Sequence, residues 1–363
     1  MVGVIPDEEA GALPDRFIHL VQPGDRARSP GYGETLARWS NGGDREPFFE
    51  HPVEPVGPLT PTPAAQRFAD FVHNANAATD AADGDAAADA AIDTLLRMND
   101  SVVAIAVRRR TRADETGRCA VLYPAIAEAA SRVGAKAVGL IDVGCSAGLN
   151  LNVDRVGITY SDGHSLGDPS SPVQLSSSIV GDRPVPTRAM PEVVARVGVD
   201  LDPVDVTDAD DARWLRACLW PDQPDQPDQP ERAARLEAEM ALAATAPPLL
   251  LRGDAVEVLP EAFARVPTDA LPVVTTTWAL SRFPLESRLR FLHRLDEAAA
   301  GRAVAWVSAE GVGVAPTIPT LGDRRASGHS IIGLAVFDRP ALRSEAIGHC
   351  WSQGRMLAWL ADS

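Results

Sequence analysis

The sequence predicts an α/β protein with a doubly wound parallel sheet and helices on both faces. Three observations favour this class. From residue 138 onward, short apolar runs alternate with amphipathic helical segments, which is typical of parallel strands joined by helices. A glycine-containing turn follows the first apolar run. The 363 residues are 45% hydrophobic and 23% charged, as in an ordinary globular protein large enough for one or two domains.

The central stretch is Val138–Asn152, with the sequence VGLIDVGCSAGLNLN. It predicts a buried strand, a tight turn and the start of a helix. Asp142 lies near the carboxyl end of the strand, where a charge needs a function or a partner. The turn consists of small residues, which let a ligand approach the backbone amides of the following helix; they are Gly144, Cys145, Ser146, Ala147 and Gly148. Ligands of open α/β sheets bind in this kind of crevice.

Two known sequence motifs can be compared directly with this turn. The dinucleotide pattern G-x-G-x-x-G fails at two positions, where Ser146 and Leu149 stand. The nucleophile elbow G-x-S-x-G matches Gly144–Gly148, with Ser146 as the nucleophile. A hydrolase would need a later acid and histidine, for which His293, His329 and His349 are available. Against it, the preceding ~135 residues look helical or irregular rather than stranded, and Asp142 would oppose a developing oxyanion.

The rest of the chain is divided by composition. Residues 1–118 are rich in proline, glycine and irregular stretches, and we expect them to form an irregular or helical lid ahead of a domain at 119–363. Glu115 and Arg118, just before the helix Val121–Val133, face the ligand crevice in this interpretation; alternatively they belong to a solvated loop that stabilises the helix start. An inserted hairpin is expected at about 153–190. The expected later strands are 193–202, 302–308, 330–338 and 341–349. We also expect a strand, a turn and a short helix within 248–260, and a strand followed by a loop within 271–284.

The motifs after residue 120 resemble the S-adenosylmethionine (SAM) methyltransferase superfamily one by one. DVGCSAG at 142–148 resembles its first motif, GVDLDP at 198–203 its second-strand motif, and GDAVEVLP at 253–260 its third. VVTTTWALSRFP at 273–284 resembles the fourth strand and its loop, and the hairpin near the carboxyl terminus the antiparallel seventh strand. The resemblance implies a Rossmann-like sheet of about seven strands with an antiparallel last strand.

The same resemblance implies a cofactor site. Asp200, or Asp202 if the register differs, would hold the ribose hydroxyls, and Asp254 would lie beside the adenine amino group. The full expected cofactor-binding set is Asp142, Gly144, Cys145, Ser146, Gly148, Asp200, Asp254, Ala255 and Thr276. The candidate catalytic residues are Glu115, Arg118, Trp278 and Glu310. Trp278 packs against cofactor or substrate, or else in the core; Glu310 accepts a proton at the crevice edge, or else is solvated at the surface.

The chain also resembles a bacterial family of unknown function. The shared segments include ETGRCA, DVGCSAGLNLNVD, GDPSSPV and WLRACLWPDQP. We therefore expect a SAM-dependent methyltransferase within that family, acting on a small-molecule acceptor. The alternatives are a serine hydrolase using Ser146 and a non-catalytic relative that binds SAM or a nucleotide.

Charge and cysteine usage limit the partners. A net charge of −16 argues against nucleic acid as a partner. The four cysteines, at 119, 145, 218 and 350, are scattered without a C-x-x-C pair, so we expect reduced thiols, no metal site and a cytoplasmic protein. The first thirty residues contain no apolar signal core, and no run approaches the ~20 apolar residues of a membrane span.

Overall fold

The computed structural model of this chain describes residues 97–110, 117–219, 229–323, 328–339, 341–351 and 354–361. The chain divides into two units, Met1–Phe68 and Ala69–Ser363, and all of the described residues belong to the second. Residues 1–96 and Glu115, on which the expectation of a lid depends, lie outside the described residues. Helix α6 (Asn99–Arg108) is the first described element.

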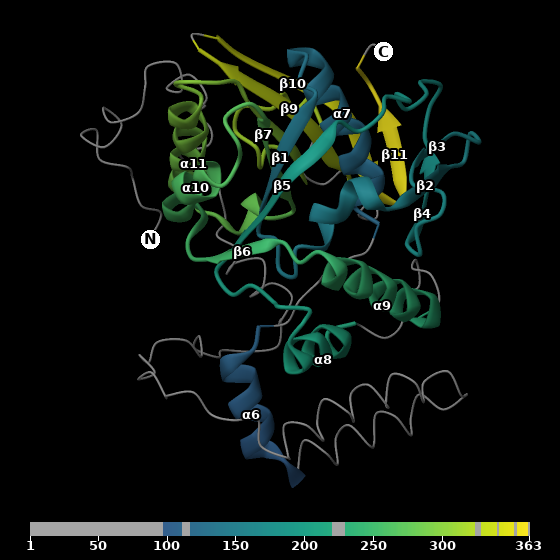
Figure 1. The fold of residues 1–363 in the computed structure, drawn as a ribbon, viewed down its shortest axis with the longest axis vertical. Helices are drawn as coiled ribbons and strands as arrows, with labels where there is room; N and C mark the ends of the chain where they lie inside the picture. Colours follow the sequence, from purple (N-terminus) through teal and green to yellow (C-terminus); the bar gives the residue numbers. More distant parts are fainter. Residues whose placement is uncertain are drawn as a thin grey trace. The chain divides into compact units, whose positions relative to one another are not determined.

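One sheet of eleven strands forms the centre of the second unit (Figure 1). The strands are β1 (Ala137–Val143), β2 (Gly157–Tyr160), β3 (Ser165–Gly167), β4 (Gln174–Ile179), β5 (Glu192–Asp200), β6 (Leu249–Arg252), β7 (Leu271–Thr277), β8 (Val304–Gly311), β9 (Ser330–Asp338), β10 (Ala341–Trp351) and β11 (Met356–Trp359). Their order across the sheet is β3-β2-β4-β11-β10-β9-β8-β7-β1-β5-β6.

Five neighbouring strands, β6, β5, β1, β7 and β8, are all parallel. From β1 the chain builds outward to β5 and β6, then returns to the other side of β1 to form β7 and β8. The direction in which successive strands are added to the sheet therefore reverses between β1 and β7. This arrangement confirms a mixed α/β fold with a mostly parallel sheet.

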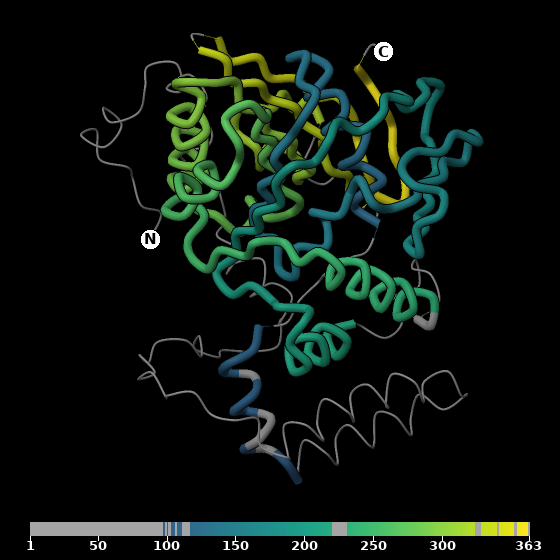
Figure 2. Tube along the Cα trace, in the orientation of Figure 1, coloured from purple at the N-terminus to yellow at the C-terminus, as the bar shows by residue number. Residues whose placement is uncertain are grey.

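The remaining strands extend the sheet beyond β8. Strands β9, β10 and β11 follow one another antiparallel. Strand β4 then pairs parallel with both β11 and β2, and β3 closes the edge antiparallel to β2. The sheet exceeds the expected seven or so strands because residues 157–179 contribute three and β11 a fourth. Only β2 and β3 form a hairpin there, and Figure 2 shows this teal segment running beside the yellow carboxyl-terminal strand.

Helices cover both faces of the parallel strands. Helix α7 (Cys119–Val133) packs on the face that carries Leu140, Val273 and Ala305. Helices α10 (Ala255–Ala264) and α11 (Leu285–Ala298) lie together on the other side of β1 and β5 in Figure 1. There the Phe291 ring meets Trp306 edge-on, with 5.5 Å between centroids. Side chains alternate along a strand, so Ala305 and its neighbour Trp306 reach opposite helix layers.

Local sequence explains where α7 ends and β1 begins. Gly134 adopts a left-handed φ of 68°, and its N–H bonds the carbonyls of Ala130 and Ser131. A glycine in this conformation terminates a helix and satisfies its last carbonyls. Strand β1 follows three residues later, which brings the amino end of α7 back over the carboxyl end of β1.

Four further elements complete the described fold: the 3-10 segments η1 (Leu149–Arg155) and η2 (Leu280–Arg282), and helices α8 (Ala209–Ala217) and α9 (Gln229–Thr245). Helix α8 begins at Asp208, whose side chain accepts the N–H groups of Asp210 and Asp211. Such a cap stabilises a helix by ~1 kcal/mol. Among the described residues, no helix combines the length and apolar character needed to cross a membrane.

Candidate functional site

The glycine turn after β1 is fastened to the neighbouring strand β5. Gly144 N–H donates to the Val199 carbonyl at 2.8 Å, and Ser146 N–H donates to Asp200 Oδ2 at 3.0 Å. Gly144, Ser146 and Gly148 have φ of 73°, 50° and 68°, all in the left-handed region. The two glycines adopt this conformation without penalty, whereas Ser146 does so at a steric cost. The turn is therefore held in one defined shape at the carboxyl edge of the sheet.

Asp142 is buried in β1 with hydrogen bonds to both carboxylate oxygens. It is 1% exposed; Oδ1 accepts the Thr275 hydroxyl at 2.7 Å and Oδ2 accepts the Asn150 side-chain amide at 3.3 Å. Thr275 lies opposite Asp142 in the register between β1 and β7, so both side chains point to the same face. These bonds compensate part of the cost of burying a carboxylate.

A cationic and aromatic pair lies beside this carboxylate. Arg118, directly before α7, donates from NH1 to the Thr277 hydroxyl at 3.1 Å, and its guanidinium carbon lies 5.2 Å from the ring centre of Trp278. The Asn150 amide lies 3.5 Å from the same Thr277 oxygen. We call Arg118, Asp142, Asn150, Thr275, Thr277 and Trp278 the switch-point cluster. It lies where the order of strand building reverses, between β1 and β7.

The other two predicted acids follow the next two strands. Asp200 ends β5, and its two oxygens accept the N–H groups of Ser146 and Asp202, at 3.0 and 2.9 Å. Asp254 follows β6 and caps α10, accepting Val256 N–H at 2.9 Å. Both carboxylates thus hold backbone in place. Asp202 instead forms an ion pair with Arg252.

Two predicted residues, Thr276 and Glu310, lie on the opposite face of the sheet from the cluster. The Thr276 hydroxyl accepts the Trp306 indole N–H at 3.1 Å. Glu310 lies within β8 and is 1% exposed, so the expectation that it follows the strand at a solvated crevice edge is wrong. Strand β8 continues to Gly311, which keeps Glu310 inside the sheet.

Glu310 has a structural role between β8 and the loop after β7. Its Oε1 accepts the N–H groups of Ala279 and Leu280, both at 3.0 Å. Burial raises the pKa of Glu310 from 4.5 to about 7, although these N–H donors, the nearby Thr276 hydroxyl and Arg288 oppose the shift. The side chain joins β8 to the loop after β7.

Two other predicted residues are buried in packing. Cys145 is 5% exposed, and a Cβ added to Gly198 would lie 2.6 Å from its sulfur, so the glycine makes room for the thiol. Ala255, the first residue of α10, is 7% exposed. Their side chains therefore pack in the interior.

Sequence reasoning missed three members of the switch-point cluster: Asn150, Thr275 and Thr277. The run Thr275-Thr276-Thr277 contains the missing signal, because alternation sends the outer two threonines to one face and the middle one to the other. The position of Asn150 depends on the path of η1 after the turn, which the sequence does not define.

A small hollow adjoins the cluster next to Asn150. Its lining includes Cys119, Asn152 and Glu239. Burial, and then the negative charges of Glu239 and Asp142, raise the pKa of the Cys119 thiol well above its usual value, which keeps the thiol protonated. The Asn152 side-chain amide is buried, and its Nδ2 has no partner among the described residues. The hollow thus offers a polar donor and an acidic wall.

The four described histidines each lie near a carboxylate away from Ser146. His164 pairs with Asp162, His293 with Glu297, and both His329 and His349 lie next to Asp323. The φ of 50° at Ser146 is the feature that a nucleophile elbow would share. The arrangement of these histidines gives the hydrolase hypothesis no support.

Comparison with known proteins identifies one family. The model of a family described as "Uncharacterized protein conserved in bacteria (DUF2332)" matches residues 64–359. This match confirms the resemblance to a bacterial family of unknown function. A search of curated proteins found no match, and a search of solved structures found none either.

Proposed function

The chain belongs to the DUF2332 family, and we propose that it binds SAM and transfers the methyl group to a small-molecule acceptor. The observation that carries the proposal is the position of the β1 turn. Parallel strands in the order β6-β5-β1-β7-β8 place this turn and the switch-point cluster at the point where building reverses. Ligands of doubly wound sheets bind outside the carboxyl ends of the strands at such a point. We accordingly propose that the parallel half is Rossmann-like.

The charges of the cluster suit the amino-acid end of SAM. A guanidinium such as Arg118 pairs well with a carboxylate, and the carboxylate of Asp142 suits an ammonium group. The face of Trp278 attracts cations and already lies 5.2 Å from the Arg118 guanidinium carbon. Both signs of charge therefore lie in one crevice, as a zwitterionic ligand requires.

The nucleoside end would extend along β5 and β6. The carboxylates of Asp200 and Asp254 follow these adjacent strands, on the side of the turn away from β7. Asp200 already accepts two backbone N–H groups, so bonds to the ribose hydroxyls would come in addition to these. This shared use predicts that Asp200 positions both the turn and the ribose.

Bound SAM would supply a methyl group on a positively charged sulfur, ready for displacement in line. The chain's contribution is to orient the acceptor and exclude water, which can supply most of the acceleration without a general base. An acidic chain of net charge −16 favours a small molecule over a nucleic acid.

Calorimetry with SAM and with S-adenosylhomocysteine tests the proposal. We expect one site per chain, and at least ~10-fold weaker binding for Asp142→Asn, because a charge-assisted contact contributes ~1.5–3 kcal/mol and 1.4 kcal/mol is one decade. The matched control is Asp168→Asn, the same change in an exposed turn where, within the described part of the chain, the carboxylate accepts hydrogen bonds only from Ser170.

The outcomes separate the possibilities. No heat and no thermal shift at millimolar ligand would contradict cofactor binding. If Asp142→Asn and Asp168→Asn weaken SAM binding equally, the loss does not report a contact between Asp142 and the ligand. Binding without methyl transfer to any acceptor in a broad panel would leave the non-catalytic SAM-binding relative as the function.

A further inference from the structure

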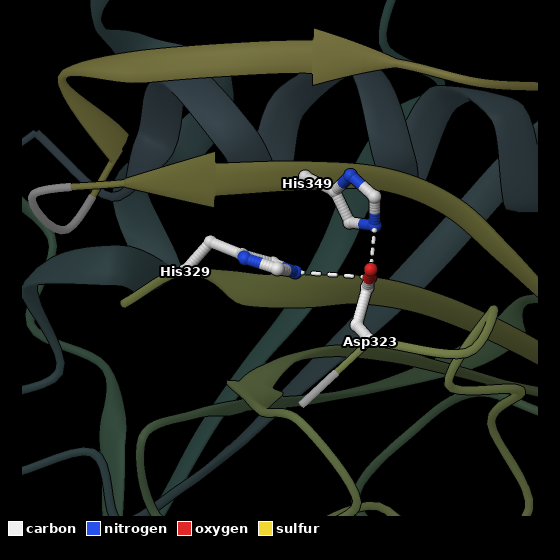
Figure 3. Close-up of side chains that lie close together, drawn as sticks. All are labelled: Asp323, His329 and His349. Atoms are coloured by element: carbon white, nitrogen blue, oxygen red, sulfur yellow. Dashed lines mark hydrogen bonds and ion pairs between the residues drawn. The ribbon is translucent and has the colours of Figure 1, made fainter. Parts of the chain in front are cut away.

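We propose that Asp323, His329 and His349 form a binding site for a divalent transition-metal ion. Asp323 lies in the segment after β8, His329 directly precedes β9, and His349 lies in β10. Figure 3 shows both imidazole rings directed at one carboxylate oxygen. The ligand atoms of the three side chains all lie within 4.8 Å of one another. No motif spacing in the sequence predicts this group, because the two histidines come together through the pairing of β9 with β10.

The distances match those between neighbouring ligands of a bound ion. His329 Nε2 and His349 Nε2 lie 3.0 and 3.1 Å from Asp323 Oδ2. Metal bonds to imidazole nitrogen and carboxylate oxygen are about 2.0–2.2 Å long. Two such ligands at a right angle are therefore about 3 Å apart, and at a tetrahedral angle about 3.4 Å apart. The two imidazole ligand atoms lie within 4.8 Å of each other, and an ion would draw them to about 3.4 Å or less.

A hydrogen-bonded pair explains only half of this arrangement. His329 Nε2 makes a hydrogen bond of normal geometry to Asp323. His349 Nε2 is buried and has no hydrogen-bond partner among the described residues, although it lies 3.1 Å from the same oxygen. A buried imidazole nitrogen without a donor or acceptor is costly, and a metal ion between the three groups would satisfy it.

The surroundings suit a site with open positions. The side chains of His329, His349 and Asp323 are 8%, 18% and 27% exposed, so the group is enclosed except on the carboxylate side. The Trp351 ring lies 5.7 Å from the His329 ring and 6.1 Å from the His349 ring, providing an apolar wall. Three protein ligands of the set N, N, O leave room for water or substrate, as in sites for Zn²⁺ or Fe²⁺.

The site adjoins the switch-point cluster through one hydrogen bond. Ser330, next to His329, accepts the Trp278 indole N–H at 2.8 Å. A metal-bound ligand would therefore lie near Trp278, at the same edge of the sheet as the β1 turn. The metal proposal does not depend on SAM, and either can fail without the other.

Zn²⁺ titration of the chelator-treated full chain tests the site. By calorimetry we expect one ion per chain in the wild type. His349→Ala and His329→Ala should each weaken binding at least ~100-fold, since losing a group that merely supports a ligand already costs 10–100-fold. The matched control is His293→Ala, which removes a histidine next to Glu297 on α11, where no third ligand is close among the residues that the structure describes. Circular dichroism checks that each variant is folded.

A second readout excludes a merely structural role. Zn²⁺ should raise the melting temperature of the wild type and of His293→Ala, but not that of Asp323→Asn, which keeps the side-chain shape and loses the anionic ligand. Co²⁺ should give visible absorption bands that the His349→Ala variant loses. The proposal is overturned if the wild type binds no Zn²⁺, or if His329→Ala and His349→Ala bind it as the wild type does.

Discussion

Ser146 illustrates how one residue in a strained conformation can suggest two chemistries. Its φ of 50° fits a nucleophile elbow, yet its N–H is held by Asp200 and helps to fix the shape of the turn. In the SAM-binding hypothesis the residue acts through its backbone. In the hydrolase hypothesis it acts through its hydroxyl oxygen.

The Ser146→Ala variant distinguishes these roles. We expect it to fold and to bind S-adenosylhomocysteine within about threefold of the wild type, because alanine keeps the N–H donated to Asp200. A difference of ~1 kcal/mol would already be about fivefold. A fluorophosphonate probe should leave the wild type unlabelled. Labelling that disappears in Ser146→Ala would establish a nucleophilic serine instead.

Gly198 provides a packing test at the same turn. A Cβ there would lie 2.6 Å from Cys145 Sγ and 2.7 Å from Leu250 Cδ2. Gly198→Ala should therefore lower the free energy of unfolding by ~1–3 kcal/mol, the usual cost of overpacking. Urea denaturation measures it. Gly301→Ala is the control, because an added Cβ there meets nothing within 4 Å. Adding Cys145→Ala to the first variant should recover part of the loss; equal stability of all variants would contradict this account.

At the scale of elements, Glu310 joins strand β8 to the loop between β7 and η2. Its pKa, raised from 4.5 to about 7, means that the folded state binds this proton more tightly than the unfolded state. The contribution of Glu310 to stability therefore falls as the pH rises from about 4.5 to about 7. The protonated acid is the form that suits this buried position.

The Glu310→Gln variant should remove that dependence. Glutamine keeps an oxygen for the Ala279 and Leu280 N–H groups and cannot titrate. We expect the variant's stability relative to the wild type to increase by up to ~3 kcal/mol between pH 4.5 and 7, at 1.36 kcal/mol per pKa unit. Chemical denaturation at a series of pH values measures the difference. A difference that stays constant with pH would mean that Glu310 has an ordinary pKa.

The sequence predicted individual elements well but not the faces of all their side chains. The strand–turn–helix around Asp142 and the strand ending at Asp200 follow from apolar runs and glycines, which are local signals. Glu310 was misplaced because the length of β8 decides whether a residue near its end is buried. Thr276 was placed in the cofactor-binding set, whereas its neighbours Thr275 and Thr277 face the cluster.

At the scale of the molecule, β11 connects the added strands to the main sheet. It pairs with β10 on one side and β4 on the other, and Ser177 donates its hydroxyl to the Gly354 carbonyl at 2.8 Å. Trp359 at its end is 2% exposed. Sequence reasoning expected only a hairpin at 153–190, because pairing between segments so far apart has no local signal.

Substitution of Trp359 tests this connection. Trp359→Ala should cost ~3–5 kcal/mol in the free energy of unfolding, the usual range for a buried aromatic residue. Trp359→Phe should cost much less, because it keeps most of the ring and removes a buried indole N–H that has no partner among the described residues. Met356→Ala, in the same strand but 37% exposed, should stay within ~1 kcal/mol. Similar losses for Met356→Ala and Trp359→Ala would contradict this role of the buried indole.

The pairing of β4 with β11 also has a consequence during synthesis on the ribosome. Residues 174–179 leave the ribosome well before residues 356–359, yet they contact the main sheet through them. The edge of β4 that pairs with β11 therefore stays unpaired until residues 356–359 have been translated. Exposed strand edges favour association with other chains. We expect a ribosome-bound chain stalled before residue 356 to bind chaperones, and one stalled well after residue 359 to release them.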